Sequence, residues 1–250
     1  MLAAERQAKI IEMIKSKGSV QVEDLAQELK VSAMTIRRDL VKLQEEGKVE
    51  RCHGGAVAKQ EVNYAEKQTS HRNVKERLAG KCASFVSEGD TIFLDAGTTT
   101  YEIAKRIKEI PGILIVTNDL EIARLFMDSE VEVFVCGGRV QKETGSMFDR
   151  YAAGLLADFK FDIGFFGAAS INEAYEVTTP TVEKMWIKRE TPKQCEKAYL
   201  VVDHSKFDRQ AMVRVNHLKD YTAVVTDYKF CKEELEELRQ MGTVIIRGQN

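Results

Sequence analysis

The chain has 250 residues, of which 44% are hydrophobic and 30% are charged, and its formal net charge is −2. This composition excludes a disordered or fibrous protein and provides for one large core, or for a medium and a small one, so two domains are expected. Because the net charge is close to zero, any contact with nucleic acid has to come from a local basic patch.

No pattern of a secreted or membrane protein is present in the sequence. The five cysteines lie far apart, without a Cys-x-x-Cys pair or histidines at zinc spacing, which predicts free thiols in a reducing compartment and no metal site. Charged residues begin at Glu5 and Arg6, before a signal-peptide core could form, and no run approaches the roughly 18 apolar residues of a membrane span. We therefore expect a cytoplasmic protein with no membrane partner.

Residues 1–57 are predicted to form a small helical domain. Segments 6–17 and 22–29 each carry an apolar stripe, and Ser32 is a good N-cap for a third helix. A helix that follows a short helix and a tight turn, with arginines near its own start, is typical of insertion into the DNA major groove. The residues of this third helix that the apolar stripe leaves for solvent are Thr35, Arg37, Arg38 and Lys42.

Residues 48–57 predict two short strands around a Gly-Gly turn. Such a hairpin would act as a wing, with Arg51 and His53 near DNA phosphates. The alternative is a packing module whose arginines form a solvated face. Five basic residues within positions 37–51 favour DNA binding over that alternative.

Residues 58–73 are polar and without periodicity, which predicts a linker, and a helix over 74–86 is expected to open a second domain, 74–250. Short apolar runs then alternate with amphipathic segments, which predicts an α/β domain with an open, mainly parallel, doubly wound sheet. The predicted strands are 91–95, 113–117, 131–135, 162–166, 198–203, 223–227 and 244–246. The predicted helices between them are 101–107, 120–127, 181–189 and 232–240.

Small and polar residues follow strand after strand in this domain. In a parallel sheet these clusters meet at the carboxyl edge, where open α/β folds bind ligands. A glycine and three threonines before a helix suit an anion such as phosphate, and a lysine or arginine could neutralise its charge. Helix capping and tight turns are the alternative explanation for any single cluster. The candidate ligand-binding residues are Asp95, Gly97, Thr98, Thr99, Thr100, Thr117, Asn118, Gly137, Gly138, Arg139, Gly167, Asp203 and Lys206.

Three segments carry a resemblance to a known family. The repeat Arg6-x-x-x-Ile10-x-x-x-Ile14, the run from Ser32 to Leu40 and the His53-Gly54-Gly55-Ala56 turn resemble the helix-turn-helix signature of the DeoR family of bacterial repressors. The resemblance implies operator binding, with Ser32 added to the DNA-contacting positions. For residues 74–250 it implies a sensor domain similar in fold to ribose-5-phosphate isomerase, which recognises phosphorylated sugars or related metabolites.

The function predicted from these features is a transcriptional repressor of a sugar-metabolism operon, modulated by a phosphorylated sugar. Helix-turn-helix proteins read paired half-sites, so a homo-oligomer, dimer or tetramer, is expected. Two alternatives stay open: a sugar-phosphate isomerase-like enzyme, for which Asp95, Glu183, Asp203 and Lys206 offer acids and bases, and a transcriptional activator. No catalytic triad or cofactor fingerprint is evident in the sequence, so neither catalysis nor a cofactor is predicted.

Overall fold

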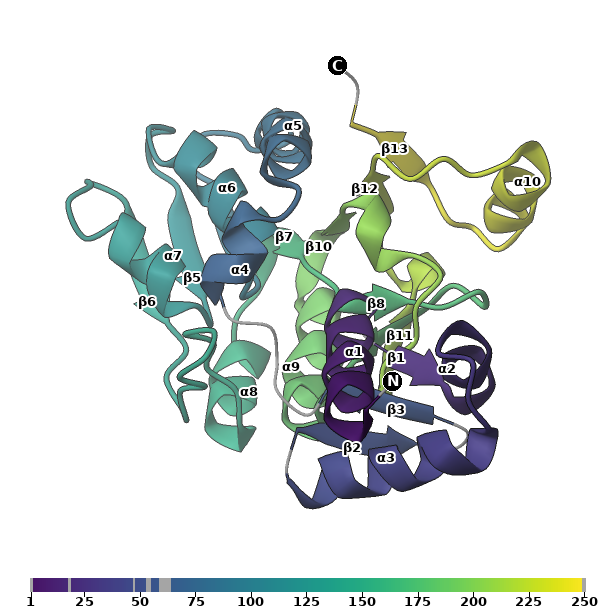
Figure 1. Ribbon diagram of the computed structural model, residues 1–250. Coiled ribbons are helices and arrows are strands. Elements are labelled where there is room, and N and C mark those ends of the chain that lie inside the picture. Colours follow the sequence, from purple (N-terminus) through teal and green to yellow (C-terminus); the bar gives the residue numbers. More distant parts are fainter. Residues whose placement is uncertain (1, 18, 47, 53–54, 59–63, 249–250) are drawn as a thin grey trace.

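The computed structural model describes residues 2–17, 19–46, 48–52, 55–58 and 64–248. An N-terminal module of three helices and a small sheet precedes a larger α/β domain (Figure 1). Within these ranges no helix is long and apolar enough to cross a membrane. Cys82, Cys136, Cys195 and Cys231 form no disulfide among the described residues, and the side chain of Cys52 lies outside them.

The N-terminal module contains helices α1 (Ala3–Lys17), α2 (Val22–Glu28) and α3 (Ala33–Glu45). Strands β1 (Ser19–Gln21), β2 (Val49–Cys52) and β3 (Gly55–Ala58) form an antiparallel sheet in the order β1-β3-β2. The predicted apolar stripe of α3 is confirmed, because Ile36, Leu40 and Leu43 are at most 1% exposed and pack in one core with Ile10 and Ile14 of α1.

Seven parallel strands form the central sheet of the α/β domain, in the order β13-β12-β10-β7-β4-β5-β6. Each corresponds to one of the predicted strands, with ends that differ by at most three residues. Their bounds are β4 Thr91–Leu94, β5 Leu114–Thr117, β6 Glu132–Val135, β7 Phe161–Phe166, β10 Cys195–Val202, β12 Ala223–Thr226 and β13 Ile245–Arg247.

Both faces of this sheet are covered, which explains why its strands are continuous apolar runs. Side chains alternate between two cores along each strand. In β4, Ile92 and Leu94 enter a core with α5 (Arg72–Ala83), α6 (Thr98–Ile107) and α7 (Leu120–Leu125). Phe93 points to the opposite core. That second core includes residues of α8 (Arg150–Ala157), α9 (Met185–Glu190) and α10 (Lys232–Gln240).

Some elements were not expected from the sequence. Strands β8 (Ser170–Ile171), β9 (Glu176–Thr179) and β11 (Val213–His217) form a second, antiparallel sheet in the order β11-β9-β8. Helix α4 (Tyr64–Thr69) lies inside the segment predicted to be a linker, and α8 was not predicted. The predicted helix 181–189 is divided into a 3-10 turn, Val182–Lys184, and α9.

The order of the strands defines a switch point in the middle of the sheet. From β4 the chain continues through β5 and β6 to one edge, and it then returns to β7 on the other side of β4 before it proceeds to β10, β12 and β13. The loops after β4 and β7 therefore diverge and leave a crevice between them. Open α/β sheets bind their ligands at this position.

Candidate functional site

Helix α3 begins at an N-cap that the sequence predicts. The Ser32 hydroxyl accepts a hydrogen bond from the Thr35 backbone N–H at 3.1 Å, and the two hydroxyls lie 2.9 Å apart. Arg37, Arg38 and Lys42 are exposed, whereas Thr35 is half-buried. The helix therefore offers three cationic side chains and one hydroxyl pair to a ligand outside the protein.

A buried carboxylate fixes α3 against α1. Asp39, 5% exposed, accepts hydrogen bonds from Arg6 Nε at 2.5 Å and from Arg6 Nη2 at 3.2 Å. The Gln7 side-chain amide donates a third at 2.9 Å. A two-pronged arginine contact fixes orientation as well as distance. The angle at which Arg37 and Arg38 are presented thus depends on Arg6, a residue of a different helix.

The predicted wing corresponds to the hairpin of β2 and β3, in which Cys52 pairs with Gly55. A Cβ at Gly55 would lie 2.1 Å from the Val20 carbonyl oxygen of β1, so this position requires glycine for the close approach of two backbones. Arg51 lies in β2. The described residues include neither the side chain of Arg51 nor His53, so their predicted contacts with DNA stay predictions.

The crevice between the β4 and β7 loops is part of a cavity of about 360 Å³. Asp95, Ala96 and Gly97 follow β4 and line one side, and Gly167 and Ala168 follow β7 and line another. The volume suits a small metabolite. A cavity of that size therefore lies at the carboxyl edge of the sheet, where the sequence predicts a ligand site.

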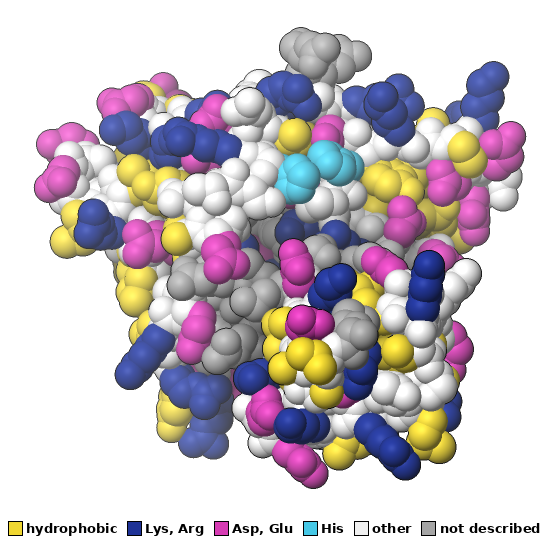
Figure 2. Space-filling model, in the orientation of Figure 1, with side chains coloured by type: hydrophobic (Ala, Val, Ile, Leu, Met, Phe, Trp, Pro, Cys, Tyr) yellow, Lys and Arg dark blue, Asp and Glu magenta, His cyan; other side chains and the backbone are white. Residues whose placement is uncertain are grey.

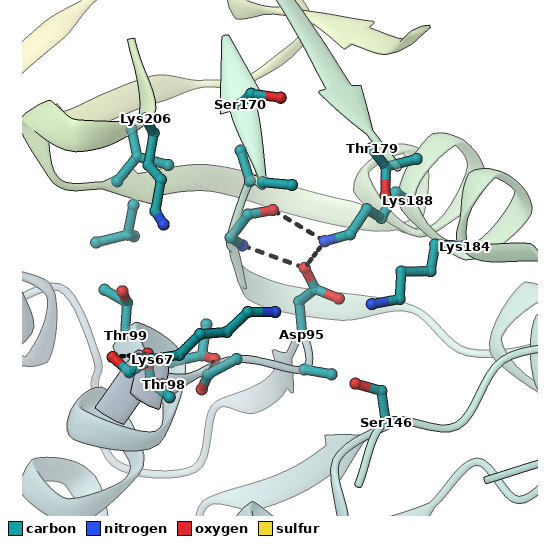
Figure 3. A pocket seen from close by; sticks show the side chains of 18 of the residues that line it. Lys67, Asp95, Thr98, Thr99, Ser146, Ser170, Thr179, Lys184, Lys188 and Lys206 are labelled. Carbon is teal, nitrogen blue, oxygen red and sulfur yellow. Dashed lines mark hydrogen bonds and ion pairs between the residues drawn. The ribbon is translucent and has the colours of Figure 1, made fainter. Parts of the chain in front are cut away.

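Cationic side chains outnumber acidic ones in the lining. Figure 3 shows Lys67, Lys184, Lys188 and Lys206 reaching into the cavity from four different elements. Lys75 and Arg209 also line it, against two carboxylates, Glu66 and Asp95. A cavity with an excess of positive charge concentrates anions.

Lys188 and Lys75 are held by hydrogen bonds to the surrounding structure. Lys188 contacts the Asp95 carboxylate and donates to the Gly167 carbonyl at 2.9 Å, while Asp95 also accepts from the Gly167 N–H at 3.1 Å (Figure 3). Lys75, 3% exposed, donates to the carbonyls of Lys67 and, at 2.6 Å, Ser70. Burial lowers the pKa of Lys75 to about 8. Lys75 thereby holds the end of α4 beside α5.

The start of α6 faces the same cavity. Its first intrahelical hydrogen bond runs from the Tyr101 N–H to the Gly97 carbonyl, which leaves the N–H groups of Thr98, Thr99 and Thr100 without an intrahelical acceptor. Such N–H groups and the helix dipole favour an anion. The Thr100 hydroxyl is used within the loop, where it donates to the Gly97 carbonyl at 2.8 Å.

The loop before α6 is supported by the segment after β5. Asn118 accepts from the Ala96 N–H at 2.7 Å, and Asp119 accepts from the Gly97 N–H at 3.0 Å. Asp119 also N-caps α7 through the N–H groups of Glu121 and Ile122. Burial raises the pKa of Asp119 to about 6.

Comparison with protein families agrees with the division into an N-terminal module and a larger α/β domain. A family model for the DeoR-like helix-turn-helix domain matches residues 6–62, and one for the DeoR C terminal sensor domain matches residues 70–228. The chain belongs to the DeoR family.

Relatives match over almost the whole length. The HTH-type transcriptional regulator GlpR of Haloferax volcanii is 31% identical, with 99% of each chain covered. The glycerol-3-phosphate regulon repressor of Escherichia coli is 32% identical over 91% of this chain and 92% of the relative. The lactose phosphotransferase system repressor of Staphylococcus aureus is 28% identical over 96% of this chain and 97% of the relative.

Among solved structures, ribose 5-phosphate isomerase A from Methanocaldococcus jannaschii shares 18% identity and 55% of each chain, with a TM-score of 0.40. The delta subunit of eIF2B from Chaetomium thermophilum shares 16% identity and 65% of this chain, 58% of its own, with a TM-score of 0.48.

Eight of the thirteen ligand-binding residues predicted for this DeoR-family chain line the cavity. They are Asp95, Gly97, Thr98, Thr99, Thr100, Asn118, Gly167 and Lys206. Thr117 lies behind the lining, where its buried hydroxyl donates to the Leu94 carbonyl at 2.7 Å.

Asp203, 1% exposed, is outside the lining too and accepts a hydrogen bond from the Ser205 N–H. Burial would raise the pKa of Asp203, but the Lys206 charge and the Ser205 hydrogen bonds outweigh it and hold the pKa below its usual value.

The remaining predicted residues, Gly137, Gly138 and Arg139, also lie outside the cavity lining. A Cβ at Gly138 would lie 2.8 Å from Asp149 Oδ1, and the Arg139 N–H donates to Asp149 Oδ2 at 2.8 Å. Asp149 in turn N-caps α8. The Arg139 side chain is 69% exposed and lies 3.6 Å from Glu183. Gly138 permits a close approach to a helix cap, and Gly137 supplies a positive φ of 70° to the turn; capping and tight turns are the alternative explanation for such clusters.

Sequence reasoning missed the cavity lysines of α4 and of the segment around the start of α9. Lys67 belongs to α4, and Lys184 and Lys188 flank the start of α9. Two lysines four positions apart lie on one side of a helix. That spacing after Thr179 and Pro180 was the available signal. Thr179 itself lines the cavity, and its hydroxyl is buried without a hydrogen-bond partner among the described residues.

Proposed function

We propose that this protein is a transcriptional repressor that binds operator DNA through α3 and the wing and that is released by a small phosphorylated sugar. The observation that carries the proposal is the cationic cavity at the switch point of the sheet, onto which the N-terminus of α6 opens. Two of the relatives are a glycerol-3-phosphate regulon repressor and a lactose phosphotransferase system repressor, which supports the same assignment.

The DNA-binding part of the proposal depends on α3. Its exposed arginines suit guanine edges, and its hydroxyl pair at Ser32 and Thr35 suits a phosphate or a base edge. Two half-sites one helical turn, or a multiple, apart would be read by two copies of the module. We therefore include a homo-oligomer in the proposal.

The sensing part depends on charge and on helix geometry together. A phosphate at the start of α6 would accept hydrogen bonds from Thr98 and Thr99 and would have Lys206 as a counter-charge. The sugar would then occupy the space toward Thr179 and Lys184. An effector weakens operator binding only if it prefers the conformation with mispositioned DNA modules, by about 1 to 3 kcal/mol.

The experiment measures operator release. Fluorescence anisotropy with DNA from upstream of the protein's own gene and its neighbours gives the operator affinity, and a panel of sugar phosphates is then titrated in. Lys206→Met and Thr98→Val should bind DNA as the unchanged protein does and should lose the response. Lys219→Met, at an exposed site, should respond normally. Normal release from Lys206→Met and Thr98→Val would refute the pocket.

A sugar-phosphate isomerase is the second candidate, because the cavity holds Asp95 and several lysines. The Asp95 carboxylate already accepts from Lys188 and from the Gly167 N–H, whereas a general base must be able to take up a proton from the substrate. A turnover assay with the same sugar phosphates separates the two functions, since the repressor releases DNA and leaves the ligand unchanged.

A further inference from the structure

Three potential metal ligands meet at the rim of the cavity. One donor atom each from His71, Asp203 and His204 lies within 4.8 Å of the others. The two imidazole rings are in contact edge to face, with centroids 4.8 Å apart, and Figure 2 shows two neighbouring histidine side chains on the surface. His71 is at the start of α5, and His204 follows β10. The cluster therefore joins two elements that are far apart in the sequence.

The His204 ring is held in a defined orientation. Asp227 accepts from the His204 backbone N–H at 2.7 Å, and its other oxygen lies 2.8 Å from His204 Nδ1. A carboxylate on Nδ1 favours the tautomer that carries the proton there, so Nε2 keeps a lone pair. Metal-binding histidines have this arrangement, in which an outer carboxylate orients the ring and raises its basicity.

A second, independent observation concerns Asp203. This side chain is 1% exposed, and its Oδ2 is buried without a hydrogen-bond partner among the residues that the structure describes. Its Oδ1 is used by the Ser205 N–H at 2.9 Å. A buried carboxylate oxygen without a partner is costly, and a bound cation would satisfy it.

We propose that His71, Asp203 and His204 bind a divalent transition-metal ion of the zinc type, with Asp227 as the outer-sphere partner of His204. Two imidazoles and one carboxylate match a three-ligand site that keeps a position open for water or another ligand. The Lys75 and Lys206 charges interact with Asp203 and oppose a cation. These charges oppose every divalent ion alike, so the choice of metal depends on the ligands: two imidazoles suit Zn²⁺, whereas Ca²⁺ and Mg²⁺ depend on oxygen ligands.

Metal binding at this site would require the two exposed histidine rings to move a short distance inward. Ligand atoms of a tetrahedral zinc ion are about 3.4 Å apart, given bond lengths near 2.0 to 2.1 Å. The donors here are at most 4.8 Å apart, and both histidines are exposed, so their rings can move inward. Ser205 and Lys206, the next two residues, line the cavity. The ion would thus lie beside the cavity without occupying it.

The test uses the full chain and needs neither DNA nor a sugar phosphate, so its result is independent of the proposed function. Cys231→Ser removes an exposed thiol, a group that competes for zinc in solution, and serine preserves the N-cap of α10. In this background, calorimetric titration with Zn²⁺ should give one equivalent per chain, and Co²⁺ should give the visible absorption of a four- or five-coordinate ion.

His71→Ala and His204→Ala should each abolish the binding of Zn²⁺, and Asp227→Asn should weaken it by about 10-fold or more. His217→Asn is the matched control at a histidine outside the cluster and should bind normally. Circular dichroism checks that the variants are folded, which is expected because both rings are exposed. No bound equivalent, or one that persists in the His71→Ala, His204→Ala double variant, would overturn the proposal.

Discussion

The Lys188 ammonium contacts the carboxylate of Asp95 at the floor of the cavity, where the loops after β4 and β7 meet. Asp95 is 1% exposed and the Lys188 side chain 13%. Removing one member of a buried pair leaves the other charge uncompensated, which costs more than the pair itself contributes.

We therefore expect Lys188→Met to lower the free energy of unfolding by about 3 to 5 kcal/mol. The double variant Asp95→Asn, Lys188→Met should recover most of this loss, because no unpaired charge remains. Urea denaturation followed by circular dichroism measures both. Lys193→Met, which breaks an exposed pair with Glu190, is the control and should change stability by less than about 1 kcal/mol. A double variant as unstable as Lys188→Met would contradict this account.

Arg37→Ala should weaken specific operator binding by about 1 to 3 kcal/mol, or roughly 5- to 150-fold, because an arginine that reads a base edge would be lost. Arg37 also lies 3.6 Å from Glu23, and both side chains are more than half exposed. Glu23→Ala removes the same surface pair without removing the arginine, so it should leave the affinity unchanged. A band-shift titration at fixed salt decides; equal affinities for Arg37→Ala and the unchanged protein would exclude this role.

Arg6→Lys should weaken operator binding although it changes nothing on the exposed side of α3. Lysine keeps the charge but cannot form the two-pronged contact with Asp39, so α3 loses its fixed angle to α1. The melting temperature of the DNA-binding module should fall as well. Lys9→Arg, at an exposed position of α1, serves as the control. Unaltered DNA affinity together with a lower melting temperature would show that Asp39 acts in stability alone.

The stability of the protein should depend on pH through Asp119. Burial raises the pKa of its folded form to about 6, above the usual carboxyl value of 3.8, so the folded protein holds this proton more tightly than the unfolded chain. The resulting stabilisation is complete below the unfolded pKa and is lost as the pH rises through 6. Between pH 5 and 7 the loss from this group is about 1 kcal/mol. Asp119→Asn should remove that component of the pH profile, measured by urea denaturation; an identical profile in this variant would assign it to other groups.

The seven strands of the central sheet could be predicted because burial on both faces makes each of them a continuous apolar run, as in Leu200, Val201 and Val202. The smaller sheet could not, because β9 contains Glu176 and two threonines and is stabilised by pairing with distant strands. Helix α4 has no apolar stripe, and its contacts come from elsewhere in the fold, including Lys75.

The residues of the candidate site likewise fall into those that the sequence could place and those that it could not. Residues directly after parallel strands, such as Asp95 and Gly167, could be placed together because the carboxyl ends of the strands share an edge. The lysines of α4 and of the segment around the start of α9 could not be placed there, because the pattern of strands does not predict how a helix packs against that edge. Gly137 and Gly138 follow a strand as well, but this loop approaches the N-cap of α8: the Arg139 N–H donates to Asp149, and Gly138 leaves room for that carboxylate.

Helix α4 begins six residues after β3 ends, and Lys67 and Ser70 of this region line the cavity. The segment that follows the N-terminal module thus forms part of the cavity wall, so the proposed effector would contact this segment directly, without a signal that has to pass through the sheet. In a genetic screen for strains that no longer respond to inducer, substitutions should accumulate at positions 64–71 as often as in the loops that follow the strands.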